Sequence, residues 1–179
     1  MLTADASVLL LIDIQGNLAQ LMHDRQTLFK NLQILIKSAR ILDVPIVWME
    51  QIPEKLGHTV PVVAGLLRDR RPMAKTTFSC CADPDIMAAI EAAGRRQVLV
   101  TGIETHICVY QSTRDLLQRG FEVHVISDAV SSRVIDNKEI GLARMKQEGA
   151  LISSVEMALF EMLREATGDR FRQIVKLLK

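Results

Sequence analysis

Short apolar runs alternate along the chain with longer segments in which apolar residues recur at helical spacing. The first run, residues 8–12, is continuously apolar, which is typical of a parallel strand buried on both faces of its sheet. Similar runs predict the other strands, at residues 46–49, 72–75, 97–100, 121–126 and 150–152. The pattern therefore predicts a sheet of about six strands.

The segments between these runs predict helices that cover the sheet. Apolar residues at i, i+3 and i+4 spacing between Leu18 and Leu42 predict one long helix there. Asp83 is expected to cap the next helix, with Pro84 at its first position. Further helices are expected at residues 105–119, at 155–166 and at 169–178, and one more is expected from Asp136, as its cap, to near Gly149. Residues 52–71 are expected to form an irregular loop with about one helical turn.

Alternation of strands and helices is typical of an α/β domain with a parallel sheet between two helical layers. We therefore expect a three-layer αβα sandwich with an open, mainly parallel sheet. No composition shift or linker divides the sequence, so we expect a single domain over residues 1–179.

Composition narrows the possible functions. The chain of 179 residues is 49% hydrophobic with a net charge of +1, which disfavours disorder. The near-zero net charge and the 4% aromatic content argue against a nucleic-acid partner. No apolar stretch is long enough to cross a membrane, and three cysteines without a signal-like segment predict a reducing, cytoplasmic location.

Three reactive side chains stand just after predicted strands. In open parallel sheets, ligands bind beyond the carboxyl ends of the strands, and Asp13, Lys75 and Cys108 lie there. Each also has an ordinary interpretation, as a turn residue, a solvated lysine or an inert core thiol. Together they supply a base, a cation and a nucleophile at neighbouring strand ends.

The position of Cys108 adds to this hypothesis. It falls in the first turn of the helix expected after Gly102, where unpaired N–H groups carry positive partial charge. Such a position is expected to lower the thiol pKa and to hold an oxyanion formed when sulfur attacks a carbonyl.

Three segments resemble the isochorismatase-like cysteine hydrolases, over nearly the whole chain and in order. They are LLLIDIQGNL at 9–18, PMAKTTFSC at 72–80 and LVTGIETHICVYQSTRDLLQRGFEVHVISDAVSSR at 99–133. The segment GIETHICV at 102–109 is most similar to the small isochorismatase-domain-containing subgroup.

The resemblance implies a role for each matching residue. Asp13 corresponds to the general base, Lys75 to the catalytic lysine and Cys108 to the nucleophile. It also implies a cis peptide bond between Ile103 and Glu104, with the backbone N–H groups of Glu104 and Cys108 forming an oxyanion hole. The residues expected to contact the substrate are Gln15, Gln51 and Phe78.

The same resemblance predicts the reaction class. Isochorismatases proper lack the cysteine, so Cys108 favours hydrolysis of a small amide or ureido C–N bond through a thioester, without a cofactor. Nicotinamidases carry an Asp-x-His…His metal site after the second strand, whereas here only His58 follows, so we expect no metal. The alternative is an isochorismatase-fold binding or scaffold protein with little turnover. The resemblance also implies a homo-oligomer, a dimer or larger, that takes a small-molecule substrate.

Overall fold

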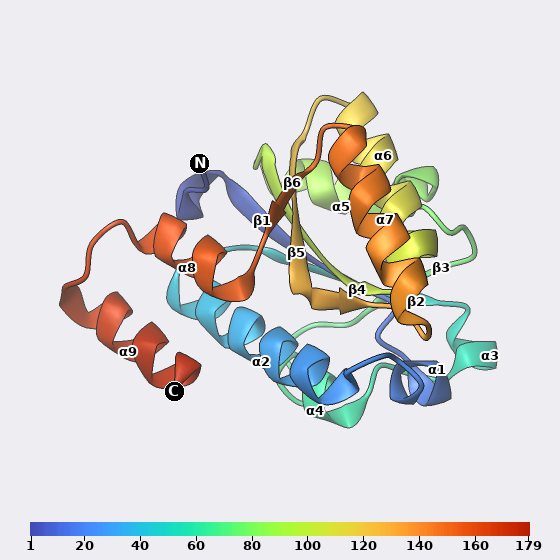
Figure 1. The fold of residues 1–179 in the computed structure, drawn as a ribbon, viewed down its shortest axis with the longest axis horizontal. Helices are drawn as coiled ribbons and strands as arrows, with labels where there is room; N and C mark the ends of the chain where they lie inside the picture. Colours follow the sequence, from blue (N-terminus) through green and yellow to red (C-terminus); the bar gives the residue numbers. More distant parts are fainter.

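The computed structural model describes all 179 residues and has one parallel sheet at its centre (Figure 1). The strands are β1 (Ser7–Ile12), β2 (Ile46–Gln51), β3 (Met73–Lys75), β4 (Gln97–Ile103), β5 (Glu122–Ser131) and β6 (Leu151–Ser153). They lie in the order β3-β2-β1-β4-β5-β6, and every neighbouring pair is parallel. The predicted parallel α/β sheet is therefore confirmed.

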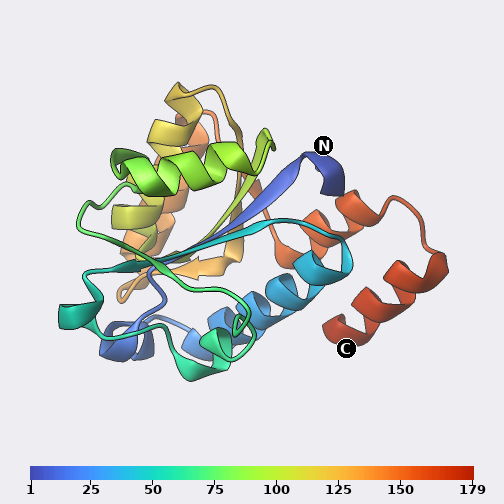
Figure 2. The same ribbon diagram turned by 180° about the vertical axis from the view of Figure 1, so that it is seen from behind.

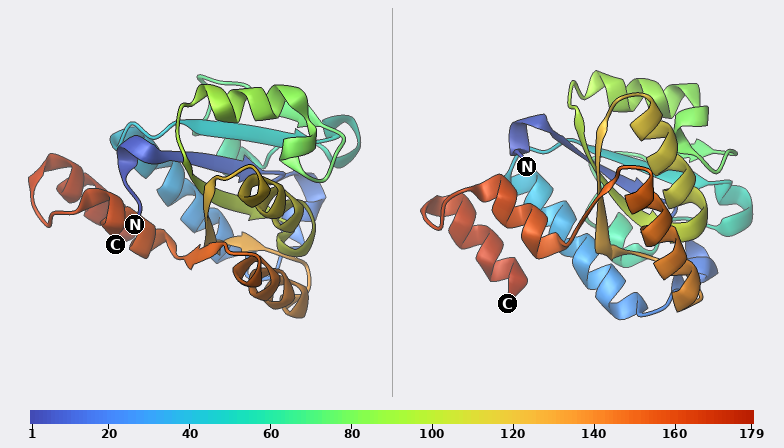
Figure 3. Two further views of the ribbon diagram at one scale, coloured as in Figure 1. Left: turned by 90° about the horizontal axis from the view of Figure 1, so that it is seen from above. Right: turned by 45° about the horizontal axis from the view of Figure 1, so that its top comes forward.

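Helices cover both faces of this sheet, so that the sandwich has three layers (Figures 2 and 3). One layer holds α2 (Arg25–Ile41) and α8 (Val155–Leu163), with α9 (Gly168–Leu178) packed on both; the other holds α5 (Pro84–Ala92), α6 (Tyr110–Gln118) and α7 (Ile135–Gln147). Within β1, Leu9 and Leu11 join the first core, whereas Val8, Leu10 and Ile12 join the second. Burial on both faces explains why the strands are continuously apolar.

The long helix expected between Leu18 and Leu42 is in fact two helices, so that prediction is wrong. They are α1 (Gly16–Gln20) and α2, and they are separated at Asp24, which has a left-handed conformation with φ of 46°. The Asp24 side chain accepts a hydrogen bond from the N–H of Thr27 and so caps α2. Met22 is buried in the connection, and for this reason the apolar pattern continues across the break.

Smaller differences concern the loops and helix starts. Residues 52–71 contain two single-turn helices, α3 (Pro53–Leu56) and α4 (Pro61–Ala64), instead of one turn. Helix α7 begins at Ile135 with Val134 as its N-cap, so Asp136 lies in the first turn and is not the cap. The proposed Asp83 cap is confirmed, because its carboxylate accepts from the N–H groups of Asp85 and Ile86. No helix has the length and apolar character to cross a bilayer.

The chain reverses its direction of progress across the sheet between β1 and β4. Such a switch point leaves a crevice beyond the strand ends, where ligands of α/β proteins bind. Gly102 lies opposite Ile12 in this pairing and has φ of 112°. A Cβ atom at Gly102 would lie 2.0 Å from the carbonyl oxygen of Ile12, so only glycine allows this approach of the two strands.

Substitution of this glycine tests the constraint. We expect Gly102→Ala to lower the free energy of unfolding by about 3 kcal/mol or more, because strained backbone and a backbone clash add together. Gly94→Ala is the matched control, since Gly94 has φ of 65° but no atom within 4 Å of the added Cβ. It should cost only about 1–2 kcal/mol in urea denaturation. Equal losses in the two variants would contradict the interpretation.

Candidate active site

Lys75 and Asp13 form a buried ion pair beneath the strand ends. Lys75 Nζ lies 2.7 Å from Asp13 Oδ2, and the two side chains are 0% and 3% exposed. The ammonium group also donates to Gln51 Oε1 at 2.5 Å and to the carbonyl oxygens of Thr77 and Phe78 at 3.1 and 3.4 Å. These oxygens offset the cost of burying the ammonium, and the interaction ties β3, β2 and β1 together.

The second carboxylate oxygen of Asp13 is left without a partner. Oδ1 is buried and has no donor within hydrogen-bonding distance in the chain, although the Cys108 thiol is near enough to contribute to the pKa of Asp13. Burial raises the pKa of Asp13 above its usual value, and the nearby charge of Lys75 partly opposes that rise. Asp13 therefore has one oxygen fixed by Lys75 and one available to take a proton.

Cys108 does not lie in an ordinary first turn of an α-helix. Residues Thr105–Val109 form a π-helical turn that leads into α6, where the sequence predicted a helix from 105. Cys108 Sγ lies 4.0 Å from Gln51 Oε1, the atom that also accepts from Lys75. Gln51 therefore links the cation to the thiol, and its own amide nitrogen is held by the carbonyl of Thr76.

The thiol pKa moves in the direction opposite to the one expected from the sequence. Burial, together with the negative charge of Asp13, raises the pKa of Cys108 to about 12. The expected lowering by a helix N-terminus is wrong, because desolvation outweighs both the turn and the charge of Lys75. Cys108 is therefore a protonated thiol near neutral pH and needs a base to become a nucleophile.

A small pocket of about 130 Å³ opens above these groups. The residues that line it are Asp13, Leu18, Gln51, Leu56, Phe78, Ile103, Glu104, Ile107 and Cys108. Phe78 is 54% exposed and contributes an apolar side chain to the wall. Gln51 and Phe78, both expected near the substrate, thus border the same space as Cys108.

Gln15 occupies a different position from these two residues. It is fully buried and does not line the pocket. Its amide donates to the carbonyl oxygens of Gln51 and Gly57 at 3.1 and 2.7 Å and accepts from the Gln51 N–H at 2.6 Å. Gln15 thus connects the end of β2 with the loop that follows α3.

Glu104 follows β4, and the peptide bond between Ile103 and Glu104 is cis, as expected. The Glu104 side chain is 6% exposed, and its Oε1 accepts hydrogen bonds from the backbone N–H and from the Nε of Arg133, each at 3.1 Å. This ion pair was not predicted from the sequence. The one indication of it there is Arg133, a basic residue two positions after the end of β5.

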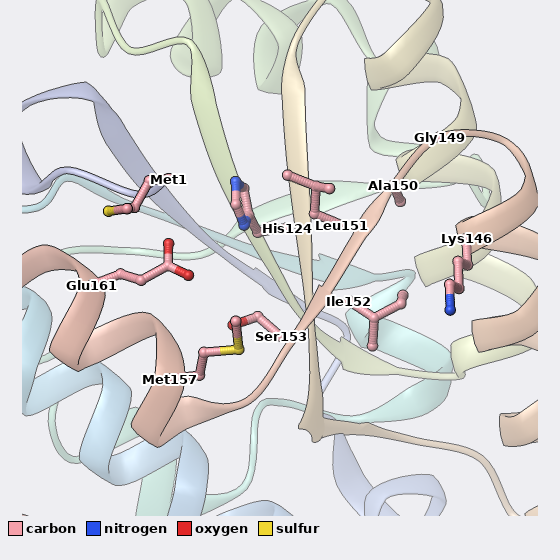
Figure 4. Close-up of a pocket in the computed structure, with 10 residues that line it drawn as sticks. All are labelled: Met1, His124, Lys146, Gly149, Ala150, Leu151, Ile152, Ser153, Met157 and Glu161. Carbon is pink, nitrogen blue, oxygen red and sulfur yellow. The ribbon is translucent and has the colours of Figure 1, made fainter.

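A larger hollow of about 550 Å³ lies near β6 and α8 (Figure 4). The one histidine that lines it, His124, is paired with Glu122, with its Nε2 2.7 Å from Glu122 Oε1. None of the three predicted catalytic residues lines it, so the smaller pocket is the better candidate for chemistry. No three His, Cys, Asp or Glu side chains gather anywhere in the chain as a metal-binding group.

Comparison with known proteins identifies a family for the chain. A sequence model of the isochorismatase domain matches residues 7–157. The chain belongs to the isochorismatase family. It is therefore a hydrolase of this family. Isochorismatase family protein 1B of Dictyostelium discoideum is 35% identical to it over 98% of this chain and 87% of that protein.

Solved structures share the fold of this chain. A Caenorhabditis elegans protein described as MAR1 ribonuclease is 34% identical, with a TM-score of 0.92 over 99% of this chain and 91% of that one. The Escherichia coli YcaC gene product, described as an octameric hydrolase of unknown specificity, is 22% identical. It has a TM-score of 0.92 over 98% of this chain and 89% of that one, and at this identity it shows the fold alone.

The energetic weight of the ion pair can be measured with a double-mutant cycle. Lys75→Met leaves the Asp13 carboxylate buried without its cation, so we expect the free energy of unfolding to fall by about 3–5 kcal/mol. Asp13→Asn combined with Lys75→Met should recover most of that loss, because no lone charge remains. Chemical denaturation of these variants and of Asp13→Asn alone completes the cycle.

An exposed pair provides the control for this cycle. Arg170 and Asp43 are 2.8 Å apart, but their side chains are 57% and 80% exposed. Arg170→Met should therefore cost less than about 1 kcal/mol. If Lys75→Met costs no more than Arg170→Met, the buried pair does not have the role described.

Proposed function

We propose that this isochorismatase-family hydrolase cleaves a small amide or ureido C–N bond through a thioester on Cys108. The observation that carries the proposal is the unpartnered Oδ1 of Asp13, buried in the wall of the pocket that Cys108 also lines. A base with a free oxygen beside a protonated thiol is the arrangement that nucleophilic catalysis by cysteine requires.

In the first half of the proposed reaction, Asp13 takes the proton of Cys108 as sulfur attacks the carbonyl carbon. The S–C bond forms, and the carbonyl electron pair moves to oxygen. The backbone N–H groups of Glu104 and Cys108 hold this oxyanion. Lys75 keeps Asp13 in place and partly balances the negative charge through its contacts with Asp13 and Gln51.

In the second half, the oxyanion collapses and the C–N bond breaks. Asp13 returns its proton to the departing nitrogen, which leaves as ammonia or an amine. Asp13 then accepts a proton from water as the water attacks the thioester carbon. Collapse of the second oxyanion breaks the S–C bond and releases the acid, and Asp13 returns the proton to the sulfur.

The pocket favours a small substrate. Its volume of about 130 Å³ is below the 300–1,000 Å³ of typical drug-sized ligand sites. The ribonuclease name of the nematode relative raises RNA as a second possible substrate. We disfavour it here, because a phosphodiester at Cys108 would lie against the carboxylates of Asp13 and Glu104. An oligoribonucleotide belongs in the assay as a separate arm.

Ammonia release from a panel of small primary amides and ureas tests the proposed activity. We expect Cys108→Ala to lower kcat/KM by about a thousandfold or more, because the nucleophile is lost. Cys81→Ala is the control. Cys81 is buried outside the pocket, so this variant should keep most of the activity. If the wild-type protein releases nothing from any compound, the scaffold alternative is favoured; cleavage of the oligoribonucleotide alone would favour a ribonuclease.

The pH dependence of kcat/KM tests the role of Asp13. Activity should fall as Asp13 is protonated, with a midpoint above the ordinary carboxyl value of 3.8, because burial raises the pKa of Asp13. The charge of Glu50 also raises that pKa, so Glu50→Gln should move the midpoint to lower pH. A midpoint that does not move, or that moves to higher pH, would count against Asp13 as the base.

The location, the oligomeric state and the partners of the protein remain to be tested. A cytoplasmic location and a homo-oligomer stay predictions, as does the absence of a nucleic-acid partner. The Escherichia coli protein is described as octameric, so the oligomeric state of this chain is worth measuring by light scattering.

A further inference from the structure

The charges around the pocket are unevenly distributed. Two of its nine lining residues, Asp13 and Glu104, are acidic, and none is Lys, Arg or His. The charge of Asp13 is already matched by Lys75 at 2.7 Å. Glu104 is therefore the group whose charge decides the local balance.

Arg133 balances Glu104 only in part. The Arg133 side chain is 54% exposed, so solvent screens the charge of its guanidinium, whereas the Glu104 side chain is only 6% exposed. Both hydrogen bonds from Arg133 go to Oε1, which leaves Oε2 with no hydrogen-bond partner inside the chain. A buried carboxylate with a free oxygen repels a second negative charge and accepts hydrogen bonds from N–H donors.

The field of Glu104 also extends to the nucleophile. Its negative charge is among the causes that raise the pKa of Cys108, after burial and Asp13. A ligand at the sulfur therefore experiences the same charge.

We propose that Glu104 selects the substrate by charge, so that Cys108 reacts with an uncharged carboxamide or urea and not with an analogue that carries a carboxylate beside the reacting carbon. Glu104 acts here through its side chain, separately from the backbone N–H proposed for the oxyanion. The inference rests on the proposed function, because it takes Cys108 as the nucleophile. Arg133 tunes the selection by partly neutralising Glu104.

Iodoacetamide and iodoacetate provide matched probes, because they differ in charge and react by the same step. Sulfur forms a bond to the CH₂ carbon, the C–I bond breaks, iodide leaves, and the thiol proton passes to Asp13. The alkylation rate of Cys108 by each reagent is measured by peptide mass spectrometry, which distinguishes Cys108 from Cys80 and Cys81. Each rate is then divided by the rate at which the same reagent alkylates 2-mercaptoethanol.

The ratio of the two normalised rates is the readout, because a change in the pKa of the thiol affects both reagents alike. We expect the wild-type protein to favour iodoacetamide and Glu104→Gln to narrow that preference by about tenfold. Arg133→Gln should widen it, since Glu104 then loses its cation. Glu139→Gln removes the same charge from an exposed site on α7 and should leave the ratio unchanged.

Two results would overturn the inference. One is an unchanged ratio in Glu104→Gln together with an unchanged ratio in Arg133→Gln. The other is equal narrowing in Glu104→Gln and Glu139→Gln, which would indicate the general field of the protein. Thermal unfolding of each variant shows that it is folded, and Arg133→Gln provides an independent test if Glu104→Gln is not.

This experiment separates the inference from the proposed function. If the rate ratio changes as expected in the Glu104 and Arg133 variants but the protein releases no ammonia, charge selection is supported and the amidase activity is rejected. If the protein releases ammonia but the rate ratio does not change in these variants, the amidase activity is supported and charge selection is rejected.

Discussion

The position of the whole site depends on one ammonium group that has no access to water. Lys75 Nζ is completely buried, and a lone cation there would cost several kcal/mol. Oxygens from Asp13, Gln51 and the chain after β3 must therefore converge on it. Those groups come from the ends of three neighbouring strands, so satisfying this one charge fixes where the strand ends lie relative to one another. Gly102 completes the arrangement by letting β4 approach β1 closely.

The same burial sets the resting state of the site. Desolvation raises the pKa values of both Asp13 and Cys108, so the proton remains on sulfur while Lys75 keeps the carboxylate charged. A protonated thiol is less readily oxidised than a thiolate, because oxidation begins from the thiolate. In the proposed mechanism the nucleophile therefore forms only as the attack occurs. A site of this kind relies on a well-placed base more than on a permanently ionised sulfur.

Features that depend on continuous local patterns could be predicted from the sequence. Strands buried on both faces give uninterrupted apolar runs, so the sheet and the strand-end positions of Asp13 and Lys75 followed directly. The break at Asp24 was hidden because Met22 continues the apolar pattern across it. The pairing of Glu104 with Arg133 joins residues 29 positions apart and depends on β5 extending to Ser131. Local periodicity contains no information of that kind.

The two glutamines near the site show why residue type and strand position are not enough to assign roles. Gln15 and Gln51 both stand near a strand end, yet Gln51 contacts Lys75 and Cys108 while Gln15 bonds only to backbone. The bonds of Gln15 fasten the loop after α3 to the end of β2, and Leu56 of α3 forms part of the pocket wall. The charged groups of the pocket thus stand at or just beyond strand ends, whereas part of its apolar wall comes from the segment after β2, which Gln15 fastens together with several backbone hydrogen bonds. The proposed charge selection accordingly depends on groups held at strand ends, whereas the shape of the accepted substrate depends mainly on the segments between strands.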